Sequence, residues 1–107
     1  MTTAVFYQKG GLLYGFCVSG HTDTSGSDSA RLVCAAVSSA VYLAANTITD
    51  VIGDRADVSV SDGELSLLLS DNHRSQDILL GLKLHLDGLK EQYPEFIQLK
   101  MEVQHDA

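Results

Sequence analysis

Several residue types are scarce in this sequence, and each shortage argues against a class of protein. The 107 residues include no tryptophan, one proline and two cysteines, and only 7% are aromatic. No run of about 18 uninterrupted apolar residues is present, which argues against a membrane span. The first residues lack the basic start and apolar run of a signal peptide. We therefore expect a cytoplasmic protein with no membrane partner, whose two cysteines stay reduced.

Basic side chains are scarce as well. The chain has 14 acidic and 7 basic residues and a formal charge of −7. A surface of this sign repels phosphate backbones, so we expect no nucleic-acid partner. It favours a basic partner, such as a protein rich in lysine and arginine.

The remaining composition is that of an ordinary globular protein, with 45% apolar residues. It predicts a single domain over residues 1–107 that needs no disulfide and no structural metal to fold. Gly10-Gly11 and Asp62-Gly63 are turn pairs between alternating segments and predict two β-hairpins. The expected elements are strands 2–9 and 12–19, a helix from 30 to about 46, strands 57–61 and 64–69, a helix ending near 92, and strand 96–103.

This order, ββαββαβ, predicts an α+β fold of two layers. We expect a mostly antiparallel sheet with two helices packed on one face. Asp71 or Ser75 is the expected cap of the second helix, and Pro94 stops it.

The first predicted helix is apolar on nearly all sides. Asp28 or Ser29 is its expected N-cap. Because its outer side is also small and apolar, either the sheet curls around it or a second copy of the protein packs against it. We interpret Tyr42 and Leu43 on that side as dimer contacts rather than as part of a ligand pocket.

Cys34 and His21 form the strongest candidate for a catalytic site. A cysteine nucleophile needs a nearby base, a lowered pKa and access to substrate. Cys34 falls near the start of the first helix, where the helix dipole stabilises a thiolate and free N–H groups can bind an oxyanion. His21 ends a strand just before the polar loop 22–29 that leads into this helix, so the two side chains can meet. His21 would then take the thiol proton as general base.

Each of these residues also has a simpler interpretation. Cys34 alone would be a small buried hydrophobe on an alanine-rich helix, as most such cysteines are. His21 alone would be a surface loop residue. The conjunction of Gly-His at a strand end, a loop of small polar residues and a cysteine at a helix start favours catalysis.

Other residues are weaker candidates. Cys17 shares the strand side of His21 and can approach the site, but a core thiol is the favoured interpretation. A zinc site of Cys17, His21 and Cys34 has suitable ligand types, yet no paired-ligand spacing supports it. We therefore expect no metal.

Ser38 lies one turn after Cys34 and could touch the site, but a serine on a packed helix usually bonds its own backbone. Asp23 and Asp28 could orient His21 as a third member. The remaining histidines are expected on the surface: His73, His85 and His105.

The segment from Gly20-His21 to Leu32-Val33-Cys34-Ala35-Ala36-Val37-Ser38 resembles the ribosomal-processing cysteine protease family. The family pattern is Gly-His, a glycine-containing loop, an aliphatic pair and Cys-Ala-Ala-Val-Ser. The resemblance implies a homodimeric α+β protein with a dyad at His21 and Cys34 and no cofactor. It also implies the activity, which is removal of a short N-terminal extension from a large-subunit ribosomal protein during ribosome assembly.

Two positions depart from the family pattern. Thr22 stands where the family usually has Ala, and Arg31 stands where it usually has Asp. Together with the acidic surface, these departures motivate an alternative function on the same fold, a non-catalytic binding module for a basic ribosomal protein. A structural dimer module without activity is the third possibility.

Overall fold

The computed structural model describes residues 1–20, 27–70 and 74–104 of the chain. The elements, in chain order, are β1 (Thr2–Lys9), β2 (Leu12–Gly20), α1 (Asp28–Asn46), the π-helical segment η1 (Thr47–Ile52), β3 (Ala56–Ser61), β4 (Glu64–Leu69), α2 (Gln76–Gln92) and β5 (Ile97–Gln104). The predicted order ββαββαβ is confirmed.

The five strands form one mixed sheet in the order β3-β4-β2-β1-β5. Neighbouring strands are antiparallel except for β1 and β5, which are parallel. The parallel pair arises because α2 carries the chain from β4 across the sheet to its other edge, and parallel strands require such a crossover. The predicted mostly antiparallel sheet is therefore confirmed.

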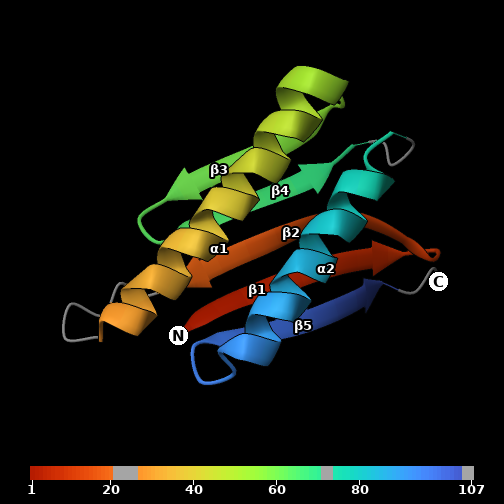
Figure 1. The fold of residues 1–107 in the computed structure, drawn as a ribbon. Helices are drawn as coiled ribbons and strands as arrows, with labels where there is room; N and C mark the ends of the chain where they lie inside the picture. Colours follow the sequence, from red (N-terminus) through yellow and green to blue (C-terminus); the bar gives the residue numbers. More distant parts are fainter. Residues whose placement is uncertain (21–26, 71–73, 105–107) are drawn as a thin grey trace.

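Both helices cover the same face of the sheet, as predicted, and they run in opposite directions (Figure 1). The core lies between the two layers. Its fully buried side chains come from alternate positions of the central strands and from the inner stripes of the helices, and they include Phe6, Phe16, Val37, Leu67, Leu79, Leu86 and Ile97. Removal of this apolar surface from water is the main force that holds the layers together.

The opposite face of the sheet has no helix over it (Figure 1). Side chains alternate between faces along a strand, so the residues next to Phe16 and Val18 point to this open face. Val5, Cys17 and Ser66 face one another across β1, β2 and β4 in this layer. The sheet thus has one face that packs against the helices and one face that no helix in the described part of the chain covers.

The start of α1 differs from the prediction. The helix begins at Asp28, and its N-cap is Ser27, whose Oγ accepts a hydrogen bond from the Ala30 N–H at 3.2 Å. The expected caps Asp28 and Ser29 are already helical. A serine hydroxyl caps a helix as well as a carboxylate does, and the loop offers several such residues in a row.

The other helix ends are also informative. Beyond Asn46 the chain continues as η1 and stops at Gly53, whose φ of 79° is a left-handed conformation that glycine adopts without strain. Ser75 precedes α2 as predicted, but its hydroxyl donates to the Asp54 carboxylate and caps no helix N–H. Asp71, the other expected cap, lies outside the described residues.

The sheet does not curl around α1. The outer side of this helix stays open in the single chain, where Leu32 is 67% and Leu43 is 66% exposed. By length and composition, the helical stretch Asp28–Ile52 is apolar enough to cross a membrane, although it contains no long uninterrupted apolar run. Core helices of globular domains share this property, and the inner stripe of α1 packs against the sheet here.

Candidate active site

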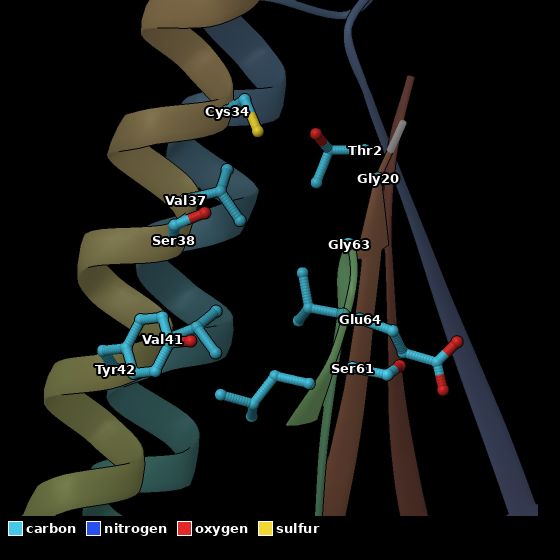
Figure 2. A pocket seen from close by; sticks show the side chains of 12 residues that line it. Thr2, Gly20, Cys34, Val37, Ser38, Val41, Tyr42, Ser61, Gly63 and Glu64 are labelled. Carbon is cyan, nitrogen blue, oxygen red and sulfur yellow. The ribbon is translucent and has the colours of Figure 1, made fainter. Parts of the chain in front are cut away.

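Cys34 lies on α1 and points from the helix toward the sheet, where β2 ends (Figure 2). Its side chain is half-buried. It lines a pocket of about 200 Å³ between α1 and the β3–β4 hairpin, whose other lining residues are Thr2, Val18, Gly20, Val37, Ser38, Val41, Tyr42, Ser61, Gly63, Glu64 and Leu65. The interpretation of Cys34 as a fully buried core residue is therefore wrong, because the thiol opens into a pocket.

One stripe of α1 forms the helical wall of this pocket. Cys34, Val37, Ser38, Val41 and Tyr42 are spaced three and four residues apart, so they share one face of the helix. From the first to the last of them the helix rises about 12 Å. The helical wall of the pocket is therefore about as long as three or four residues of an extended peptide.

The lining of this pocket bears on two predictions made from the sequence. Tyr42 lines the pocket, so the expectation that it forms no part of a ligand pocket is wrong, while its role as a dimer contact stays a prediction. Helical spacing from Cys34 was the signal that could have found it. Ser38 also lines the pocket, which confirms that it can touch the site.

The opposite wall is built by a close approach of two glycines. The Gly20 N–H at the end of β2 donates to the Gly63 carbonyl at 2.9 Å. Gly63 has a φ of 75°, and a Cβ there would lie 2.7 Å from the Gly20 carbonyl oxygen. Only glycine fits this position, and it holds the β3–β4 turn against the strand end that faces Cys34.

His21 lies outside the described residues. The residue before it, Gly20, lines the same pocket as Cys34. The dyad of His21 and Cys34 stays a prediction.

The helix start contributes less to the site than predicted. Cys34 falls in the second turn of α1, since the helix begins at Asp28, and the dipole effect fades beyond the first turn. The N–H groups of Ala30 and Arg31 are already bonded to the hydroxyl and the carbonyl of Ser27. The expected oxyanion site at the helix start is therefore not formed by these two donors.

Cys17 is separated from Cys34 by the sheet. It is half-buried on the open face, so it is neither close to the pocket nor in the core as expected. Burial raises the pKa of the Cys17 thiol, and the charge of Glu64 and a hydrogen bond to it raise it further. This side chain is held as a neutral thiol.

The other candidates do not assemble a second site. The described residues contain no group of three His, Cys, Asp or Glu side chains able to hold a metal. Asp28 is exposed at the start of α1, and His85 is exposed on α2. The remaining candidates lie outside the described residues: Asp23, His73 and His105.

A half-buried thiol in a partly apolar pocket gives a cysteine nucleophile access to a substrate, which is one requirement of a cysteine hydrolase. The comparisons agree with this class. The sequence matches the family described as cysteine protease Prp over residues 1–98. The chain therefore belongs to this family, and it is a cysteine protease.

Three solved structures illustrate the similarity. The ribosomal processing protease Prp of Staphylococcus aureus, solved in complex with a substrate peptide, is 25% identical with a TM-score of 0.86, over 95% of this chain and 100% of that chain. The same protease has been solved with a covalently linked product peptide. SMU.848 of Streptococcus mutans is 26% identical with a TM-score of 0.84, over 97% of this chain and 99% of that one. No curated protein matches the sequence significantly.

Proposed function

We propose that this protein is an endopeptidase that removes a short N-terminal extension from a large-subunit ribosomal protein during ribosome assembly in the cytoplasm. Cys34 is the nucleophile and His21 is the general base. The observation that carries the proposal is that Cys34 points into a pocket beside Gly20, the residue that precedes His21.

The proposed reaction has two stages. His21 takes the proton of the Cys34 thiol, and the thiolate sulfur adds to the carbonyl carbon of the scissile bond. The C–N bond then breaks, and the imidazolium gives its proton to the leaving amine. Water, deprotonated by the same imidazole, hydrolyses the thioester and restores the thiol. The covalently linked product peptide in the S. aureus protease supports a covalent route.

The acidic charge of the chain supports the choice of partner. At a net charge of −7 the protein attracts basic segments, and ribosomal proteins are rich in lysine and arginine. The pocket itself is partly apolar, with Val37, Val41 and Leu65 in its walls. We therefore expect charge to attract the substrate and apolar contacts to hold the residues beside the scissile bond.

Cleavage of a synthetic precursor peptide that carries the extension tests the proposal. Cys34→Ala should abolish cleavage, and His21→Ala should lower kcat by a factor of about 100 or more, the usual contribution of a general base. Cys17→Ala is the matched control, since it removes a thiol on the far side of the sheet, and it should leave kcat within about twofold. Cleavage by Cys34→Ala at the parent rate would refute the proposal.

The non-catalytic binding module predicts a different result. The acidic surface favours it, and Arg31 departs from the family pattern one turn before Cys34. It predicts stoichiometric binding of a basic ribosomal protein that survives Cys34→Ser, weakens with salt and yields no product. In that case iodoacetamide would react with Cys34 no faster than with free cysteine, whereas the protease requires a faster reaction that slows in His21→Ala.

We also propose that the protein is a homodimer through the first helix. An apolar groove runs along the outer side of the helical layer, lined by Ala36, Ser39, Ala40, Leu43, Ala44, Ile78, Gly81, Leu82 and His85. It lies on the opposite side of α1 from the catalytic pocket, so a second copy can cover it without blocking substrate.

A further inference from the structure

β3 is an unusually bare edge of the sheet. It is the outermost strand on the side of the catalytic pocket, and every residue from Asp57 to Ser61 is exposed. Edge strands are commonly protected from pairing by lysine, proline or a covering element. The sequence of β3, ADVSVS, contains neither lysine nor proline, and its one charged side chain is Asp57, whereas β5 at the other edge carries Lys100.

The direction of the backbone groups of β3 follows from one hydrogen bond. The Ser70 N–H donates to the Arg55 carbonyl at 3.0 Å, just where β3 begins to pair with β4. In an antiparallel pair, alternate residues bond to the partner, and those between them direct their N–H and C=O groups away from it. The residues of β3 that direct these groups outward are Ala56, Val58 and Val60.

The side chains of Val58 and Val60 lie on the helix-covered face of the sheet. They sit opposite Leu67 and Leu65, both of which are buried on that face. α1 does not cover them, since Val58 is 43% and Val60 is 58% exposed. Because Leu65 lines the catalytic pocket, an apolar strip continues from the pocket to the edge of the sheet.

β3 also ends at the pocket. Ser61, its last residue, and Gly63 in the following turn both line the pocket that contains Cys34. Val58 lies two residues farther back than Val60, about 7 Å along the strand. A chain paired with these two residues would therefore run beside the end of β3 that reaches the pocket at Ser61.

We propose that β3 binds the substrate by strand addition, in which an extended peptide segment beside the scissile bond hydrogen-bonds to the outward backbone groups of Val58 and Val60. The inference rests on the proposed function, because it assigns a second contact to the same substrate. The partner that pairs with β3 is a peptide, because this edge is continuous with the pocket that must hold the scissile bond. Asp57 and Asp62 place negative charge beside this edge, which suits a basic peptide.

The first test uses the peptide. Cys34→Ala protein binds without cutting, so affinity for a fluorescent peptide spanning the precursor cleavage site can be measured by anisotropy. Single backbone N-methyl groups are placed along the peptide. Strand addition uses every second N–H, so methylation at alternate residues should weaken binding about fivefold, and methylation between them should change it less than about twofold.

The second test uses the protein, again with Cys34→Ala. Val60→Pro removes an N–H that β4 does not use, and proline is tolerated on edge strands. Val60→Thr is the matched control, because it keeps the branched side chain and the N–H. Val60→Pro should weaken peptide binding about fivefold relative to Val60→Thr, with thermal unfolding measured to confirm that both variants fold.

The outcomes separate this inference from the proposed function. Equal weakening at every methylated position, absence of binding, or equal affinity of Val60→Pro and Val60→Thr overturns strand addition, even if the parent protein cleaves the peptide. An alternating pattern supports it even if the parent protein leaves the peptide intact. If Val60→Pro instead changes only self-association in sedimentation experiments, the edge pairs with a second copy and the inference is wrong.

Discussion

At the scale of single residues, the two cysteines differ because the sheet lies between them. Cys34 opens into the pocket on the helical side, while Cys17 lies on the open face near Glu64. Of the two thiols, only that of Cys34 lines this pocket.

Cys17 gives the protein a predictable response to alkaline pH. Burial, and then Glu64, raise the pKa of this thiol, so the folded state holds the proton more tightly than the unfolded state. The resulting contribution to stability is complete below about pH 8.5 and is lost as pH rises through the folded pKa. Urea unfolding between pH 7 and 9.5 should show a steeper loss of stability in the parent protein than in Cys17→Ala. Parallel pH profiles would contradict this assignment.

At the scale of elements, α1 depends on an N-cap that could not be singled out from the sequence, because several neighbouring residues are equally good caps. Ser27 Oγ accepts from the Ala30 N–H, and loss of such a cap usually costs about 1 kcal/mol. Ser27→Ala should lower the free energy of unfolding by about this amount in urea titrations. Ser29→Ala is the control, because Ser29 is exposed within the helix and alanine favours the helical state. Equal stability of the two variants would show that Ser27 is not the cap.

At the scale of the whole molecule, the helical layer has one packed side and one uncovered side. Leu43 is 66% exposed in the groove between α1 and α2. Leu43→Glu should convert the proposed dimer to a monomer in sedimentation velocity at micromolar concentration, because a buried charge is costly at an apolar interface. Val103→Glu, an exposed position on β5 at the edge of the sheet, should leave the dimer intact. A parent protein that is already monomeric would refute the dimer.

The order of the elements and the two-layer class were predictable because they depend on local signals. Alternating residues, turn pairs such as Asp62-Gly63 and two helical stripes each specify their element within a few residues. The position of Cys34 beside a strand end was predictable for a related reason. A short motif placed Cys34 on a helix that follows a strand end, and the fold brings that strand end to the pocket.

The remaining features depend on contacts between segments that are distant in the sequence. No local pattern shows that β5 pairs with β1 in parallel or that Cys17 faces away from Cys34. Nor does a local pattern show that Tyr42 lines the pocket. Side-chain periodicity gives two faces to each element but does not say which neighbour covers each face. The sequence by itself determined the elements and the helix that carries Cys34, whereas only the tertiary structure decided what surrounds them, because long-range packing selects among faces that are locally equivalent.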